Sequence, residues 1–486
     1  MIGIALAGRV RNDRPRIVHM KTLPPLLILV LVLAALSLDG PANAQDYFRE
    51  LDTRPVVDPY AVDPYLDDSV YNEPLSDPLM DQPIVETPSG VPGPIVETAP
   101  RFEATSYLDP AMPPTAEEEE RYNWAFGPLR FNVAAGIGLE YNDNVNLAPS
   151  GQEESSFILR PSLTLDSVWR LSEMNTLRFS LGISYAKYFN QSQYSSLLIS
   201  PQSILALSIM VGDVRITVRD RFSYQEDPYD LVVLSNVARY RRFENQAGIQ
   251  FDWAINPDLM LTAGYDHYNL WSFEEEFDSL TRAVDTLYMR PAFRINPSIR
   301  VGLNTSVSRV RFQEDIQNNG TSLFVGPFLE AAITDSTRLY LELGWQLFDF
   351  DRSGLIPDTD NASTPYVRAE IFNQLSEYYS HRLGYTRTAE VGYNTNFYEL
   401  NHVEYTGSWE ATPRLIAFPT LFYEHYKTSG SFPEKANRYG AGLGLRYILT
   451  PSVTLGLDYR FIKQDSNIVD SDYRQNLIML SLFYNF

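Results

Sequence analysis

The chain has 486 residues, with no Cys, 9 Met and 5 His against 31 Tyr, 26 Phe and 6 Trp, which excludes disulfide scaffolds, zinc ribbons and thiol catalysis. The net charge of −22 argues against a nucleic-acid binder, because phosphates have to be neutralised by a basic surface. The mean hydropathy of −0.22 argues against a bundle of membrane helices, and leaves a soluble β protein or an outer-membrane barrel, whose strands alternate polar and apolar residues.

The N-terminus has the pattern of a secretory signal peptide, which we expect to span residues 1–44. Basic residues up to Lys21 precede an apolar run from Leu26 to Leu36, and Ala42-Asn43-Ala44 supplies a small-residue cleavage site. The apolar run is about half of the roughly 20 residues that a spanning helix needs, which disfavours a membrane anchor. The absence of Cys also suits export to an oxidising compartment.

Residues 45–124 are expected to form a disordered, Pro-rich, acidic segment in the periplasm. From Gln45 to Arg121 the sequence holds 13 Pro and 18 acidic residues but only 4 Arg, too little apolar surface to offset the entropy of ordering. Two phrases are repeated, Val57–Tyr60 as Val62–Tyr65 and Pro83–Thr87 as Pro94–Thr98. They are consistent with docking of a periplasmic partner or with low-complexity drift.

A regular rhythm covers residues 125–486, the expected barrel domain. Short turn phrases such as Asn256-Pro257-Asp258 and Asn296-Pro297-Ser298 recur about every 40 residues, eight in all, and a fixed period indicates a repeated structural unit. Each period holds two segments of alternating polar and apolar residues separated by a longer loop. The eighteen expected strands are 129–141, 156–170, 176–188, 197–210, 214–224, 240–253, 259–271, 282–295, 299–312, 321–334, 338–350, 364–377, 380–393, 400–412, 415–427, 438–450, 453–464 and 473–486.

These strands favour a membrane barrel over a soluble sandwich. Soluble strands average about 5 or 6 residues, whereas about 9 to 11 tilted residues cross a bilayer. The second face of the expected strands is small or polar, as at Gly136 and Gly138 or at Glu404 and Thr406, and must meet water. We therefore expect an all-β fold, a transmembrane antiparallel up-and-down β-barrel of about 18 strands, with long loops at one end and short turns at the other.

Other features bear on the same fold. The last strand alternates outward to a terminal Phe486, which resembles the signal that hands bacterial barrels to the barrel assembly machinery. Four prolines lie inside expected strands and predict β-bulges: Pro161, Pro201, Pro291 and Pro327. Aromatic residues near strand ends are typical of interface girdles, at Tyr141, Trp169, Tyr185, Trp253, Trp271, Tyr393, Tyr447 and Tyr484.

From about Phe131 onward the chain resembles the putative beta-barrel porin 2 family of Gram-negative outer-membrane proteins. The resemblance rests on Gly138–Val145 and on Leu159–Leu163. It implies a porin-like barrel, and relatives are encoded near exopolysaccharide export systems. It does not cover the Pro-rich segment and implies no catalytic residues.

A barrel of this size encloses more room than its side chains fill. Charges on the inward face are mixed, and opposed rows of them would set a transverse field in a pore or would cross-link the wall through ion pairs. The candidate lumen-lining residues are Glu140, Arg178, Arg219, Arg290, Arg300, Glu342, Glu370, Glu404, Arg446 and Asp458.

Catalysis is disfavoured, and we expect no enzyme, no cofactor and no metal site. The histidines His267, His381, His402 and His425 lie in four different strands without a metal motif. His402 and His425 flank carboxylates on neighbouring strands and could form a small cluster. Asp143 and Asn144 suit a cation, but turn chemistry explains them better.

The sequence therefore predicts an outer-membrane channel for passive diffusion of small hydrophilic solutes. The alternative is a non-conducting or accessory barrel in surface or exopolysaccharide export, with the Pro-rich segment as a docking arm. Expected partners are outer-membrane lipid and, during biogenesis, the barrel assembly machinery, but no nucleic acid. Homo-oligomerisation stays open, and the expected location is the outer membrane of a Gram-negative bacterium, with the N-terminal segment in the periplasm.

Overall fold

The computed structural model describes residues 124–486 except 173, 227–232, 236 and 238. The expected signal peptide (1–44) and acidic segment (45–124) lie outside the described residues, apart from Trp124, which begins the first strand. Within the described part of the chain, no helix has the length and hydrophobicity needed to cross a membrane.

The described residues form twenty strands and two short 3₁₀ helices in one antiparallel sheet with its loops. In chain order they are β1 (Trp124–Phe126), β2 (Leu129–Asn142), β3 (Ser156–Arg170), β4 (Thr176–Tyr188), η1 (Ser192–Tyr194), β5 (Ser196–Ile199), β6 (Ile204–Val211), β7 (Val214–Gln225), β8 (Arg242–Asn256), β9 (Leu259–Ser272), η3 (Glu275–Leu280), β10 (Arg282–Asn296), β11 (Ile299–Phe312), β12 (Gly320–Thr334), β13 (Thr337–Phe350), β14 (Ala362–Ser376), β15 (Tyr379–Val391), β16 (Phe397–Thr412), β17 (Leu415–Thr428), β18 (Lys435–Thr450), β19 (Val453–Ser466) and β20 (Tyr473–Asn485).

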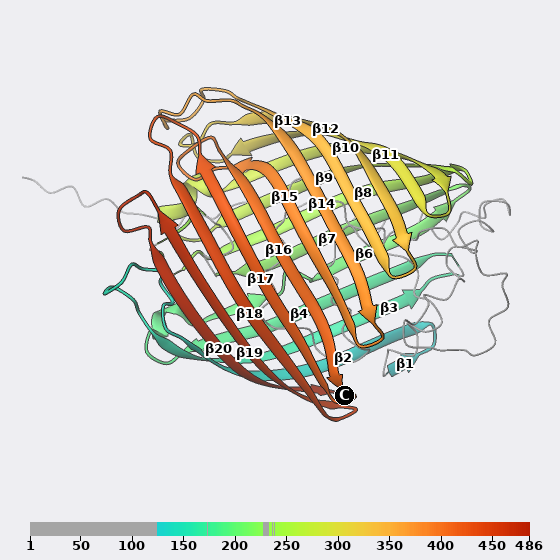
Figure 1. Ribbon diagram of the computed structural model, residues 1–486, viewed down its shortest axis with the longest axis horizontal. Helices are drawn as coiled ribbons and strands as arrows, with labels where there is room; N and C mark the ends of the chain where they lie inside the picture. Colours follow the sequence, from blue (N-terminus) through green and yellow to red (C-terminus); the bar gives the residue numbers. More distant parts are fainter. Residues whose placement is uncertain (1–123, 173, 227–232, 236, 238) are drawn as a thin grey trace, which may run out of the picture. The chain divides into compact units, whose positions relative to one another are not determined.

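The sheet closes on itself. Strands adjacent in the chain pair with one another, and β20 pairs with β2, which leaves neither with a free edge (Figure 1). β5 and β6 share one place between β4 and β7, and β1 only extends the wall along the edge of β2 beyond β20. The wall is thus a closed antiparallel barrel of eighteen strands, which confirms the predicted fold.

The strand boundaries and loops follow the prediction closely. Two expected strands, 176–188 and 299–312, have the observed bounds of β4 and β11. Eight short turns lie at one end of the described barrel, here the short-turn end, and nine longer connections lie at the other, the long-loop end. In the short turns a side chain replaces a backbone acceptor: the Asp258 amide donates to Asn256 Oδ1, and the Ser298 amide to Asn296 Oδ1, both at 2.9 Å.

The prediction of bulges at the prolines is wrong for three of the four. The register is the same on both sides of Pro161, Pro291 and Pro327, and each proline stays paired with one neighbouring strand while pairing toward the other is interrupted. A residue in an antiparallel strand directs its amide toward one neighbour only, so the missing donor costs one ladder bond and no change of register. Register shifts occur instead at six short turns.

Pro201 is different because it interrupts the strand. β5 and β6 pair with β4 in registers two residues apart, where one continuous strand over 197–210 was expected. Ser203 repairs part of the ladder at this break, since its Oγ accepts the Gly182 amide at 3.1 Å. The interruption thus adds two residues to the wall without opening it.

The two faces of the wall differ in chemistry. Large apolar side chains stay exposed along the middle of the strands on one face, including Leu139, Leu163, Leu287, Leu303, Leu343, Leu383, Leu421, Leu443, Leu457 and Leu480. An apolar belt of this extent is stable only when hydrocarbon or another apolar surface covers it. Exposed aromatics border it at the short-turn end (Trp169, Trp253, Tyr447, Tyr484) and at the long-loop end (Tyr141, Tyr185, Tyr423, Tyr439, Tyr459).

Tyr393 does not belong to this aromatic border. It lies in the loop between β15 and β16, and its ring packs against Phe277 of η3 with 5.8 Å between centroids. The predicted girdle position is therefore wrong for Tyr393: the loop turns inward, and its aromatic ring joins an apolar cluster at the long-loop end.

Candidate functional site

The polar face of the wall is the inner one. Side chains two strands apart meet on this face: Arg219 of β7 bonds Asp266 of β9 at 2.9 Å, and Asn304 of β11 bonds Glu342 of β13 at 2.9 Å. Only the concave side of a closed sheet brings such side chains within reach of one another. All ten residues singled out in the sequence share this face with them, as strand register and alternation place them.

Eight of these ten residues form ion pairs with neighbouring wall residues. The pairs between strands are Glu140–Arg160 (2.7 Å), Arg219–Asp266 (2.9 Å), Arg290–Glu330 (2.5 Å), Arg300–Glu330 (3.0 Å), Glu370–Arg382 (3.6 Å), Glu404–Arg382 (2.9 Å) and Arg446–Asp458 (3.0 Å). Charges paired so closely cancel much of one another's field at a distance. The pairs therefore act as cross-links of the wall, one of the two roles considered from the sequence.

The other two residues lack an ion pair in the described part of the chain. Glu342 is buried and accepts hydrogen bonds from Asn304 and from the Tyr340 hydroxyl, both at 2.9 Å. Arg178 is exposed near the short-turn end of β4, where the small side chain of Ala206 stands opposite it on β6. Among the ten, Arg178 is thus the charge most available to a solute.

The most buried ion pair is Arg446 with Asp458, in which neither side chain has any exposed area. Arg290 is held in two ways, by Glu330 and by the face of Phe328, whose ring centre lies 4.0 Å from the guanidinium carbon. Because desolvating a charge is costly unless it is paired, removal of one partner would leave a strongly unfavourable buried charge.

Of the two histidines expected in a cluster, only His402 reaches it. His402 Nδ1 lies 3.0 Å from Glu424 Oε1, and Arg438 Nε donates to the other carboxylate oxygen at 2.5 Å. His425 is on the outer face and contacts Asn437 at 3.0 Å. The reason is the two-residue alternation of strands, which puts Glu424 and His425 on opposite faces. Among the described residues no group of three or more His, Cys, Asp or Glu is arranged to hold a metal ion.

Asp143 and Asn144 have structural roles in the first long loop. The Asp143 carboxylate accepts the Asn476 amide at 2.6 Å, and Asn144 Nδ2 donates to the carbonyls of Ala148 and Arg474 at 2.8 Å. Leu147 of the same loop is buried against Ile462 and Tyr473. Turn and loop chemistry accounts for both polar residues, as the sequence favoured.

Glycine and small hydroxyl residues recur on the inner face from β18 through β20 and β2 to β4, between longer side chains such as Arg446, Met479 and Glu140. The small residues are Gly440, Gly442, Gly444, Gly456, Ser481, Gly136, Gly138, Ser162, Thr164 and Gly182. The inner face of β7 to β17 carries the pairs Arg219–Asp266, Arg290–Glu330 and Arg382–Glu404 and the ring of Phe328. Neighbouring side chains extend over several of these glycines, Phe483 over Gly136 and Met479 over Gly138, so the small residues let the wall pack closely.

An apolar cluster, here the mouth cluster, forms at the long-loop end. It joins Leu234 and Tyr240 of the loop between β7 and β8 to Phe277 of η3 and to strand residues from β9 to β13. Tyr240 and Phe277 lie 4.9 Å apart between ring centroids. Loop side chains thus pack against one another inside the rim instead of extending into solvent.

The same loop reaches the far wall. Val233 packs against Tyr398, Leu400, Tyr426 and Ala436, which belong to β16, β17 and β18. Its own strands, β7 and β8, lie about halfway round the barrel from these. The segment around Val233 and Leu234 therefore crosses the interior at the long-loop end. The sequence offered one signal for this that went unused, the apolar run Leu231–Leu234 within a long loop.

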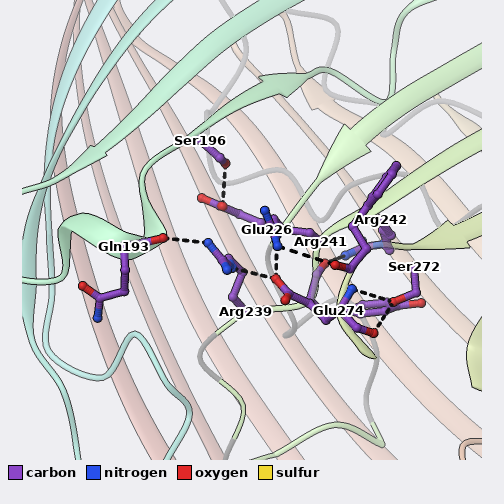
Figure 2. A network of polar contacts seen from close by, with 10 residues as sticks. Gln193, Ser196, Glu226, Arg239, Arg241, Arg242, Ser272 and Glu274 are labelled. Carbon is purple, nitrogen blue, oxygen red and sulfur yellow. Dashed lines mark hydrogen bonds and ion pairs between the residues drawn. The ribbon is translucent and has the colours of Figure 1, made fainter. Parts of the chain in front are cut away.

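A polar network anchors the base of this loop, and Figure 2 shows it. Glu274 Oε1 accepts from Arg239 Nε at 2.9 Å and from Arg241 Nε at 2.6 Å. Arg239 also donates to the Gln193 carbonyl at 2.8 Å, and Glu226 accepts from Ser196 Oγ at 2.5 Å. Three neighbouring connections are thereby tied together.

Burial alone raises the pKa of Glu274, but the guanidinium groups of Arg241 and Arg239 outweigh it and lower that pKa below its ordinary value. Glu274 is therefore a carboxylate in neutral solution, and the anchor at the base of the loop is intact there.

A second network connects four loops of the long-loop end. Asp358 is buried and accepts from the Asn396 amide at 2.8 Å and from Ser429 Oγ at 2.5 Å, while Asn318 Nδ2 donates to the Asp358 carbonyl at 2.9 Å. Asp360 adds an acceptor for the Gly430 amide at 3.0 Å. Because these loops are joined through Asp358, we expect them to move as one unit.

Comparisons with known proteins concern the C-terminal fifth of the sequence and the fold. The family model of putative beta-barrel porin 2 matches residues 386–486. A search among curated proteins finds none whose sequence matches. Similar solved structures include OccK1 (OpdK) of Pseudomonas aeruginosa, with 12% identity, 73% of this chain and 99% of that chain covered and a TM-score of 0.44. A BenF-like porin of Pseudomonas fluorescens Pf-5 has 10% identity, 74% and 100% coverage and a TM-score of 0.45.

Proposed function

We propose that the chain is an outer-membrane channel for passive diffusion of small hydrophilic solutes. The observation that supports this most is the closed eighteen-strand wall, which carries charged and polar residues along its inner face and an apolar belt on its outer face. A barrel of about 16 to 18 strands encloses more room than its own side chains fill, and ions and small solutes follow the water that enters it. The family match at residues 386–486 points the same way, to a channel rather than an enzyme.

The proposed orientation places the long-loop end outside the cell and the short-turn end in the periplasm. β1 pairs with Leu129–Phe131, the short-turn end of β2, so the acidic Pro-rich segment preceding it would lie in the periplasm. There it is available to a periplasmic partner, and we assign the barrel assembly machinery its usual role in insertion.

Arg178 is the proposed contact for solute, whereas the paired charges hold the wall in shape. The ten inner-face residues named from the sequence thus divide into one candidate contact and nine structural groups. An exposed arginine on the inner face, with no ion pair among the described residues, favours passage of anions over cations of equal size.

One observation favours a second function. The mouth cluster and the crossing segment around Val233 occupy part of the long-loop end, which suits a non-conducting or accessory barrel in surface-polysaccharide export. In that case the Pro-rich segment would serve as the docking arm.

Ion current through planar bilayers decides between the two functions. The purified full-length protein is expected to give steady, ohmic current with a modest preference for chloride over potassium. Silence in both the full-length protein and a form lacking residues 45–123 would favour the accessory function. Current that appears only in the shortened form would assign closure to the acidic segment and keep the channel.

A further inference from the structure

Basic residues collect on the outer face at the long-loop ends of β17 to β20. Lys427 of β17 and Lys435 of β18 stand directly opposite each other in the strand register. Lys463 of β19 and Arg474 of β20 form a second like-charge pair. Like charges directly opposite in a sheet are destabilising, so these four residues, here the outer basic patch, repel one another unless an anion lies between them.

Nearby acids neutralise only part of the patch. Asp465 pairs with Lys463 at 2.8 Å, and Glu399, which stands opposite Lys427, bonds Arg387 at 3.4 Å. The carboxylate of Asp472 also attracts the ammonium group of Lys463 electrostatically, and Arg474 attracts Glu153 of the first long loop in the same way. Lys427 and Lys435 are exposed and form no ion pair with any residue that the structure describes. The patch therefore keeps an excess of positive charge centred on these two lysines.

The patch lies at a definite height on the wall. From the patch toward the middle of the same strands, the tyrosines of the aromatic border come first. Leu421, Leu443 and Leu457, all exposed, follow them. The hydroxyls of Tyr423, Tyr439 and Tyr459 donate to Asn437, Asp465 and Asn476 at 2.9, 3.1 and 2.9 Å. Apolar residues, tyrosines, small polar or acidic residues and basic residues thus follow one another along these strands. This matches the order of polarity in a bilayer from its core to its headgroups.

We propose that the outer basic patch binds the phosphate groups of an anionic lipid in the outer leaflet, a phosphorylated glycolipid. Two lysines facing each other across adjacent strands offer up to six N–H donors to one phosphate, and the tyrosines below fix the depth of the acyl chains. Binding relieves the like-charge repulsion within the patch, since the anion lies between the cations. This inference rests on the proposed orientation in the membrane, though not on whether the barrel conducts.

The test uses the full-length protein in a neutral detergent, titrated with diphosphoryl lipid A or with its fully dephosphorylated form, with bound lipid counted by native mass spectrometry. The wild-type protein is expected to bind the diphosphoryl form preferentially, and added salt is expected to weaken that binding. The double variant Lys427→Gln/Lys435→Gln is expected to bind it about 30-fold more weakly, from the usual contribution of each basic residue near an anionic surface.

A matched control removes the same two charges elsewhere. Arg352→Gln/Arg414→Gln changes one exposed residue in a loop and one at a short turn, and is expected to bind lipid A as the wild type does. Equal binding of the two lipid forms by the wild type, or unchanged binding by the lysine variant, would overturn the inference. So would displacement of the lipid by excess inorganic phosphate, which would make the ligand a free anion.

Folding and function are checked in the same samples. All variants are expected to show the altered electrophoretic mobility of a folded barrel before heating and unchanged current in planar bilayers. If the protein conducts but shows no lipid preference, only this inference is contradicted. If it binds the lipid and never conducts, only the proposed channel function is contradicted.

Discussion

Inner-face charge in this barrel is held mainly as pairs, and single residues show how. The side chains of Arg446 and Asp458 have no exposed area, although β18 and β19, which carry them, extend from one end of the wall to the other. Cross-strand register alone suggests such neighbours, because residue 446 stands opposite 456 and Asp458 is the next inward position. The Arg219–Asp266 pair could not be foreseen in this way, since it skips a strand and depends on the curvature of the wall.

Replacement of Arg446 tests the cost of breaking such a pair. Arg446→Leu leaves Asp458 buried without its cation and is expected to lower the free energy of unfolding by about 3–5 kcal/mol. Arg446→Leu with Asp458→Leu is expected to recover most of that loss, because no uncompensated charge remains. Urea unfolding followed by tryptophan fluorescence measures both.

Arg178→Leu serves as the control, since Arg178 is exposed and its replacement is expected to change the unfolding free energy by no more than about 0.5 kcal/mol. Equal losses for Arg446→Leu and the double variant would show that the pair contributes by packing and not by charge.

Glu274 provides a pH-dependent prediction. Its pKa is lower in the folded protein than in the unfolded chain, so its stabilisation of the loop base is complete above the unfolded value of about 4.3 and is lost as the pH falls through the lowered value. Amide exchange at 239–242, corrected for the intrinsic rate at each pH, is expected to accelerate in that acidic range.

In Glu274→Gln the same amides are expected to exchange fast at neutral pH and to lose their acid dependence. Glu275→Gln, at an exposed neighbouring acid, should behave like the wild type. If exchange in Glu274→Gln kept the wild-type pH profile, Arg239 and Arg241 would have to be held by other groups.

At the level of elements, strands were predictable and loops were not. Alternation with a period of two and turn residues every 40 positions fix where each strand begins, because both are local properties of the sequence. The sequence predicted an irregularity at Pro201 but not that the strand would divide into β5 and β6, because that division depends on Ser203 bonding the neighbouring strand. The inward path of Val233 depends on partners in β16 to β18, more than 160 residues away.

The crossing segment yields a prediction for conductance. Val233→Asp with Leu234→Asp places two carboxylates in apolar clusters, and the cost of burying them is expected to release the segment from both walls. Single-channel conductance in planar bilayers should then rise severalfold above the wild-type value.

Leu355→Asp is the matched control, because Leu355 is an apolar loop residue that is 82% exposed and should leave the conductance unchanged. A conductance of Val233→Asp/Leu234→Asp equal to that of the wild type would mean that the segment does not lie in the path of ions.

At the scale of the whole molecule, the barrel reverses the usual distribution of apolar and polar residues in a soluble protein. Its largest apolar surface points outward, and its interior holds ion pairs together with smaller apolar clusters. Fold class and strand number were predictable because a strand long enough to cross a bilayer and alternating along its length has few other stable uses. Which inner residues meet solute was not predictable, since pairing removes most charges from reach and leaves Arg178.

The most direct measurement uses the absence of Cys in the chain and compares two adjacent residues of β17. Thr420 is on the inner face and Leu421 on the outer, where it is 54% exposed. In lipid vesicles, Thr420→Cys is expected to react with a water-soluble maleimide, and Leu421→Cys to react only after the protein is unfolded. Protection of Thr420→Cys together with rapid labelling of Leu421→Cys would contradict a wall with water inside and hydrocarbon outside.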